Sequence, residues 1–166
     1  MSNVSPADPS PRVMTTSPRS LIEAATSKIL VAGSVEAVET FFAHDYVVHV
    51  TDQDIHGGHE LIRSMASMYR KAFSDLSVEV VVFLESDDTV AWQRTMRAKQ
   101  TGAFKGFPST GLPIVWQEMV ITRVADSRIA EEWIVTDLAE RLLHGRKAVS
   151  SKLPVPSKPR LRRGEA

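Results

Sequence analysis

The sequence predicts an α+β protein in which helices come first and a long antiparallel sheet follows. Two observations support this order. Apolar residues recur at helical spacing over residues 59–73, and the stretches after them alternate apolar and polar residues as strands do. With 166 residues, 43% of them hydrophobic, the chain is long enough for one domain with its own core.

Three segments are expected to be helical before the sheet. Ser20 can cap a helix over residues 20–30, because Glu23 stands three positions later and completes a capping box. A shorter helix is expected over residues 34–42. The helix over residues 59–73 has the widest apolar face of the three, so we expect it to pack on the sheet.

Strands are expected where β-branched residues and alternation coincide. The expected strands cover residues 46–51, 77–85, 89–100, 113–124 and 128–136. Residues 52–58 are expected to form a loop, and a second, glycine-rich loop covers residues 101–112. The last four strands follow one another through two short turns and the loop of residues 101–112, which predicts a meander.

Both ends of the chain differ in composition from the middle. Residues 1–18 are rich in Ser and Pro, and residues 146–166 hold seven basic residues against one acidic residue, so that this tail carries +6 and the remainder −6. We expect two disordered tails around a domain of residues 19–145. No aromatic residue interleaves the basic charges, so nucleic acid is not an expected partner.

Several classes of protein are excluded or disfavoured by what the sequence lacks. It contains no cysteine, which rules out disulfides and thiolate chemistry. There is no run of eighteen apolar residues and no apolar signal region, so we expect a cytoplasmic protein without a membrane partner. His56 and His59, near Asp52 and Asp54, could bind a metal ion, but this polar loop offers no well-placed third ligand. The sequence also contains no phosphate-binding loop. Neither a metal nor a cofactor is therefore predicted.

The strand after Arg128 carries the first candidate for chemistry. Simple alternation places Glu131, Trp133 and Asp137 on one face, together with apolar residues. A carboxyl buried in such surroundings has a raised pKa and suits acid/base catalysis, which makes Asp137 the candidate. Asp137 can equally cap a helix over residues 138–143. Glu131 lies about 20 Å from Asp137 along an extended strand, too far for the two to form a catalytic pair.

Arg94 is the second candidate, because it shares a strand face with Trp92 and other apolar residues. Such an arginine can pair with Asp137 or bind a carboxylate or enolate oxygen of a ligand. Alternatively, it reaches the sheet edge and extends into water. His49 and Gln117 also lie on strands, where each can face either the pocket or the solvent.

The order of several short motifs resembles one protein family. Residues 123–137 show an Arg, a turn, then Ile129, Glu131 and Trp133, with Asp137 at the end. The strand and loop before them, from Thr95 to Gly111, fit the same pattern. Together these motifs resemble the SnoaL-like polyketide cyclase family, part of a superfamily that also includes nuclear-transport-factor-two-like proteins, over residues 21–143.

This resemblance implies a cone-shaped α+β barrel whose curved, mostly antiparallel sheet is covered by about three N-terminal helices and encloses one apolar pocket. It implies that Asp137 is the general acid/base of cofactor-free aldol ring closure on a small hydrophobic molecule. The residues expected to bind that substrate are Arg94, His49, Gln117, Trp133 and Trp92.

Other functions remain open on the same scaffold, which also serves isomerases, epoxide hydrolases and binding proteins without catalysis. The family resemblance further implies a homodimer formed through the outer face of the sheet. Trp116 and the alternating apolar residues of its strand are the expected contacts.

Overall fold

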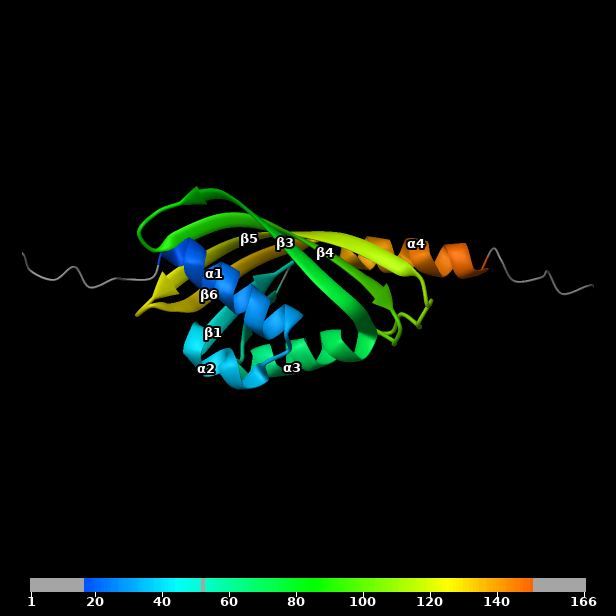
Figure 1. Cartoon of the computed structure of the whole chain (residues 1–166), viewed down its shortest axis with the longest axis horizontal. Coiled ribbons are helices and arrows are strands. Elements are labelled where there is room, and N and C mark those ends of the chain that lie inside the picture. Colours follow the sequence, from blue (N-terminus) through cyan, green and yellow to red (C-terminus); the bar gives the residue numbers. More distant parts are fainter. Residues whose placement is uncertain (1–16, 52, 151–166) are drawn as a thin grey trace, which may run out of the picture.

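The computed structural model describes residues 17–51 and 53–150 (Figure 1). Its elements are, in order, α1 (Pro18–Ala25), η1 (Thr26–Val31), η2 (Val35–Ala37), α2 (Val38–Phe41), β1 (Phe42–Val50), β2 (Gln53–His56), α3 (Gly58–Ala72), β3 (Phe73–Glu85), β4 (Thr89–Gln100), β5 (Pro113–Ala125), β6 (Arg128–Thr136) and α4 (Leu138–Ser150). Most of the two expected tails lies outside the described residues. Within them, α1 begins at Pro18 and α4 continues to Ser150.

All six strands form one curved sheet in the order β2-β1-β6-β5-β4-β3. The strands from β3 to β6 pair antiparallel as a meander, while β1 pairs parallel to β6. Helices α1, α2 and α3 lie on the concave side of this sheet, and α4 extends from its far end (Figure 1). The predicted α+β class and the cone-shaped arrangement are confirmed.

Local differences from the expected elements have simple causes. The cap of α1 is Ser17, not Ser20, because Pro18 can occupy the first turn and the Ser17 hydroxyl accepts from the Ser20 N–H. Strand β2 lies inside the expected loop of residues 52–58. It has only four residues and gains its hydrogen bonds by pairing with β1, a partner that local sequence does not reveal.

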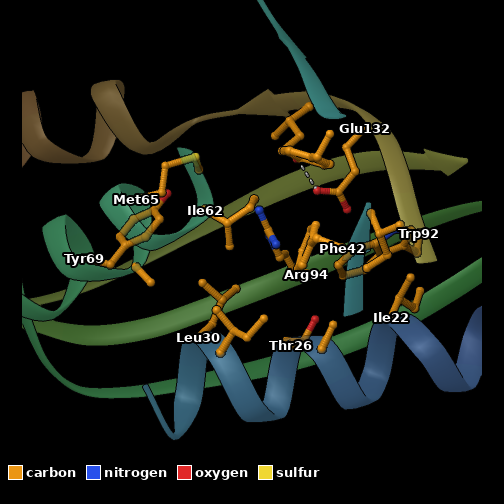
Figure 2. A pocket seen from close by; sticks show the side chains of 16 residues that line it. Ile22, Thr26, Leu30, Phe42, Ile62, Met65, Tyr69, Trp92, Arg94 and Glu132 are labelled. Carbon is orange, nitrogen blue, oxygen red and sulfur yellow. Dashed lines mark hydrogen bonds between the residues drawn. The ribbon is translucent and has the colours of Figure 1, made fainter. Parts of the chain in front are cut away.

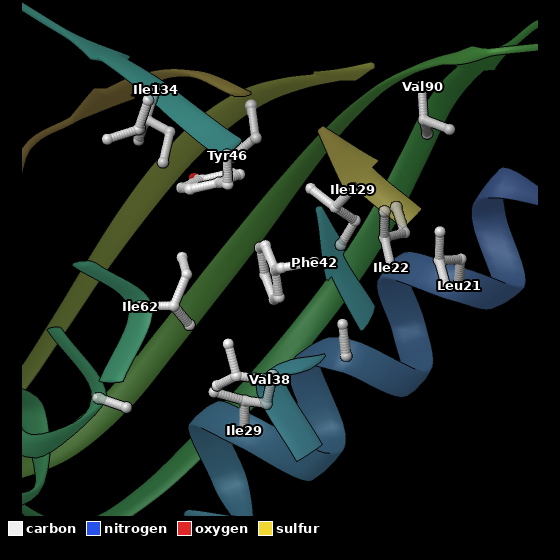
Figure 3. Close-up of a cluster of buried hydrophobic side chains, with 14 of the residues drawn as sticks. Leu21, Ile22, Ile29, Val38, Phe42, Tyr46, Ile62, Val90, Ile129 and Ile134 are labelled. Carbon is white, nitrogen blue, oxygen red and sulfur yellow. The ribbon is translucent and has the colours of Figure 1, made fainter. Parts of the chain in front are cut away.

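The core lies between the helices and the concave face of the sheet. Figure 3 shows part of it, in which Ile22 and Ile29 from the helical N-terminal segment meet Phe42 of β1 and Ile129 of β6. A second cluster around Trp116 fills the end of the sheet near α4. Burying these apolar side chains is the main source of stability for such a fold.

A bulge in β6 decides which side chains of that strand face the core. Val124 of β5 pairs with Ile129 of β6, whereas its neighbour Arg123 pairs with Glu131. One residue of β6, Ala130, is therefore left without a partner on β5 and forms the bulge. The extra residue shifts the alternation after Ile129. As a result, Glu132 faces inward and Trp133 faces outward.

Candidate functional site

An apolar cavity lies between the helices and the concave face of the sheet (Figure 2). It encloses about 530 Å³ of empty space, including the open space at its mouth. Its walls come from the N-terminal helical segment, β1, α3, β4 and β6. The polar side chains among its lining residues are Thr26, Tyr46, Tyr69, Arg94 and Glu132.

Glu132 is a buried carboxyl in this cavity, with 5% of its surface exposed. Its Oε2 accepts from the Tyr46 hydroxyl at 2.8 Å, and its Oε1 accepts from the Thr122 hydroxyl at 2.9 Å. Burial raises the pKa of Glu132 above its ordinary value, although the nearby Arg94 opposes that shift. Glu132 can therefore take up and release a proton closer to neutral pH than a free glutamate can.

Arg94 lines the same cavity and is held by a second buried carboxylate. Its guanidinium donates to Oε2 of Glu118 at 2.5 Å, and Glu118 also accepts from the Tyr69 hydroxyl at 3.3 Å. Burial disfavours the charge on Arg94, but Glu118 and Glu132, with Tyr69, together outweigh that effect, and the pKa of Arg94 lies above its ordinary value. The cavity thus contains a permanent positive charge near Glu132.

A second apolar cavity adjoins the first on the side of α4. It encloses about 670 Å³ of empty space, again including its mouth. The two cavities share Met65, Tyr69, Arg94 and Ile134 as lining residues, while Glu118 lines only the second. Arg94 therefore lies where the two cavities meet.

Asp137 lines neither of these cavities. It stands between the end of β6 and the start of α4, and its carboxylate accepts from the Gln117 backbone N–H and from the Arg141 guanidinium, both at 2.8 Å. Its carbonyl oxygen accepts the first bond of the helix, from the Arg141 N–H. The placement expected of a general base inside the pocket is not found, and the geometry is that of a helix start.

His49 and Trp133 lie on the outer face of the sheet rather than in the cavities. Their rings stack with centroids 4.8 Å apart, and the His49 ring also contacts Asp54 at 2.6 Å and Glu131 at 2.7 Å. Hydrogen bonds to Asp54 and Glu131 raise the pKa of His49, and the bond to His49 lowers the pKa of Glu131. The expectation that both residues bind substrate in the apolar pocket is corrected. The bulge in β6 turns Trp133 outward, and His49, its register partner on β1, lies on the same face.

Gln117 is also exposed on the outer face, whereas Trp116 is fully buried. The expectation that Trp116 lies on the outer face is therefore wrong. Of the six predicted site residues, the structure brings Trp92 and Arg94 together in the cavity. The indole of Trp92 donates to Thr122 at 2.9 Å.

Tyr46, Glu118 and Glu132 were not predicted, although two of them carry a usable signal. Glu118 shares one face of β5 with Trp116 and Val120, and Glu132 shares one face of β6 with Ile134. A carboxylate in an apolar row is a candidate for burial. Each strand has two alternating rows of side chains, and pairing with neighbouring strands decides which row faces the core. Alternation alone therefore could not select the row that contains the buried carboxylate.

Neither a metal centre nor a membrane span is found in the part of the chain that the structure describes. No group of three or more His, Asp or Glu side chains there has an arrangement that could hold a metal ion. None of the helices in residues 17–51 and 53–150 combines the length and apolarity needed to cross a membrane.

These features define an α+β protein with a helix-covered, curved sheet and a buried acidic site in an apolar cavity. The sequence matches the profile of the SnoaL-like polyketide cyclases over residues 21–143, and the chain belongs to this family. A comparison with curated protein sequences gives no match.

Solved structures with the same fold include three at 22–24% sequence identity. AclR from Streptomyces galilaeus, a proposed hydroxylase, is 23% identical with a TM-score of 0.66, over 82% of this chain and 96% of AclR. IdmH from Streptomyces antibioticus, a proposed polyketide cyclase, is 24% identical with a TM-score of 0.65, over 78% of this chain and 98% of IdmH. A proposed polyketide cyclase from Acidithiobacillus ferrooxidans is 22% identical with a TM-score of 0.68, over 77% of this chain and 93% of that protein.

Proposed function

We propose that this protein is a cofactor-independent enzyme of the polyketide cyclase type that removes a proton alpha to a carbonyl group of a small hydrophobic molecule. The observation that carries the proposal is the buried Glu132, which lines an apolar cavity together with the cationic Arg94. Family membership supports a cyclase-like role.

In this mechanism the Glu132 carboxylate takes the α-hydrogen as a proton. The electrons of the broken C–H bond form the C=C bond of an enolate, whose negative oxygen lies near Arg94. Within the described residues, Nε and Nη2 of Arg94 donate to Glu118, so Nη1 remains to donate to the enolate oxygen. In ring closure, the enolate carbon attacks a second carbonyl of the same molecule, and the alkoxide that forms takes the proton back from Glu132. In isomerisation, Glu132 instead returns the proton to another carbon of the enolate system, so the same first step serves both reactions.

Glu132, rather than Asp137, is assigned the proton transfer because of its surroundings. The raised pKa of Glu132 makes its carboxylate a stronger base than a free glutamate. The carboxylate of Asp137 is occupied by Arg141 and the Gln117 N–H outside both cavities.

The test uses 2-tetralone, a bicyclic ketone, as the probe. Hydrogen–deuterium exchange at its α-carbon is followed in D₂O by proton NMR. We expect the protein to accelerate exchange, with a rate that rises with pH through the pKa of Glu132. Glu132→Gln should lower the accelerated rate roughly 10²- to 10⁴-fold, because Gln cannot accept the proton. Glu131→Gln is the matched control, since its side chain faces the other side of the sheet, and it should leave the rate near that of the wild type.

Hydrolysis of an epoxide is the second candidate, favoured by the buried Glu132 beside the cationic Arg94. A protonated Glu132 can give its proton to the epoxide oxygen, and the resulting carboxylate can take a proton from the water that adds to the opened ring. Styrene oxide is the probe for this reaction. If the protein binds 2-tetralone but accelerates neither reaction, the chain is a binding protein of the same fold.

A further inference from the structure

The hydrogen bonds around Glu132 have directions that can be assigned from the chemistry of the donors. An indole N–H can only donate, so Thr122 accepts from Trp92 at 2.9 Å. The Thr122 hydroxyl then gives its own hydrogen to Glu132 Oε1, also at 2.9 Å. Thr122 is fully buried and lines neither cavity, so within the described structure its hydrogen has no other acceptor.

This chain of bonds determines where Glu132 carries its proton. Because Oε1 receives the hydrogen of Thr122, a proton on the carboxyl group belongs on Oε2. The protein atom within hydrogen-bond distance of Oε2 is the Tyr46 hydroxyl oxygen, at 2.8 Å. When Glu132 is ionised, Tyr46 donates to it; when Glu132 is protonated, Tyr46 accepts and its own hydrogen must turn elsewhere.

Tyr46 lines the cavity, so the freed hydrogen can point to a bound molecule. Burial and the neighbouring Glu132 hold the pKa of Tyr46 well above its ordinary value, so the hydroxyl keeps its hydrogen. Other ionisable groups facing this part of the cavity are Arg94 from β4 and Tyr69 from α3, and Glu118 from β5 holds Arg94 in place. Among the described residues, only Glu132 is bonded to the Tyr46 hydroxyl.

We propose that Tyr46 is a substrate-binding donor that is switched by the protonation of Glu132 and that hydrogen-bonds a carbonyl or enolate oxygen of the bound molecule. The identity of the reacting group rests on the function proposed above. In that reaction, the proton that Glu132 removes from carbon releases the Tyr46 hydrogen, which then stabilises the enolate oxygen formed in the same step. The ligand must therefore present an oxygen acceptor next to its acidic C–H group.

The switch can be tested without turnover. The chain has two tyrosines, so labelling with tyrosine carrying ¹³C at Cζ gives two NMR signals, which Tyr46→Phe assigns. With glutamate labelled at Cδ in the same sample, we expect the Tyr46 signal to shift with the same midpoint as that of Glu132. In Glu132→Gln the shift should disappear, whereas Thr122→Ser, which keeps the hydroxyl, should preserve it.

A second measurement uses 2-tetralone labelled at its carbonyl carbon. Its signal should move downfield on binding at a pH where Glu132 is protonated, and Tyr46→Phe should reduce that movement to the part that Arg94 contributes. Tyr69→Phe, which alters the other tyrosine of the cavity, is the matched control and should retain it.

Three results would overturn the inference: a Glu132 signal that does not titrate, a Tyr46 signal that stays constant while Glu132 titrates, or a downfield movement of the ketone signal that is as large in Tyr46→Phe as in the wild type. Failure of the proposed function is distinguishable from these. It would appear as absent α-exchange in a protein that still shows the coupled titration.

Discussion

Arg94 and Glu118 are direct register partners on β4 and β5, and their buried side chains form an ion pair at 2.5 Å. Removing one member of a buried pair leaves an uncompensated charge, which costs about 3–5 kcal/mol of unfolding free energy. We therefore expect Arg94→Met to destabilise the protein by that amount in urea denaturation. The double variant Arg94→Met/Glu118→Gln should lose less, because it removes both charges.

Arg97 offers a control on the same strand. It pairs with Glu79 at 3.2 Å on the exposed face, where such pairs contribute about 0–1 kcal/mol. Equal losses for Arg94→Met and Arg97→Met would contradict the buried pair.

The raised pKa of Glu132 predicts a stability that falls with rising pH. The unfolded chain titrates this group near its ordinary value of about 4.3, and the folded state holds the proton to higher pH. The contribution is fully present below about pH 4.3 and is lost as pH rises through the folded pKa. Relative to Glu132→Gln, the melting temperature of the wild type should fall over this window and then level off.

Glu131 should show the opposite sign, because its pKa is lowered by His49 and Arg123. The contribution of Glu131 to stability is present above its unfolded pKa and is lost as pH falls through the folded pKa.

The prediction for Glu132 has a clear contrary outcome. If the melting temperatures of the wild type and of Glu132→Gln change in parallel across pH, the pKa of Glu132 is not raised by folding.

Asp137→Asn tests the role that family resemblance implies for this residue. Asn keeps an acceptor for the Gln117 N–H and serves well at a helix start, and the partly exposed bond to Arg141 is worth little. We expect a stability change within about 1 kcal/mol and α-exchange of 2-tetralone close to the wild-type rate. A loss of roughly 10²-fold or more in exchange, with stability intact, would instead make Asp137 the proton carrier.

The outer face of β5 and β6 predicts self-association. Its exposed apolar side chains are Val115, Met119, Ile121, Trp133 and Val135. We propose a homodimer through this face and expect light scattering at micromolar concentration to give twice the monomer mass. Val135→Glu should yield monomers with an unchanged fold by circular dichroism, whereas Phe83→Glu on β3, which also replaces an exposed apolar side chain, should leave the dimer intact.

The sequence alone determined the features that depend on neighbours within one segment. The periodicity of residues 59–73 predicted α3, and alternation in residues 89–100 placed Trp92 and Arg94 on one face of β4, where the structure has them. These features need only the 3.6-residue and two-residue repeats of helices and strands.

Only the tertiary structure decided which carboxylate shares the apolar cavity with Arg94. The extra residue Ala130 turns Glu132 inward, pairing of β6 with β1 brings it to Tyr46, and Asp137 is left outside at the start of α4. Glu132 and Tyr46 are 86 residues apart, so their contact depends on register and on a bulge that hydrogen bonding between strands creates. Local sequence does not encode that pairing, and so the site emerged only when the sheet was assembled.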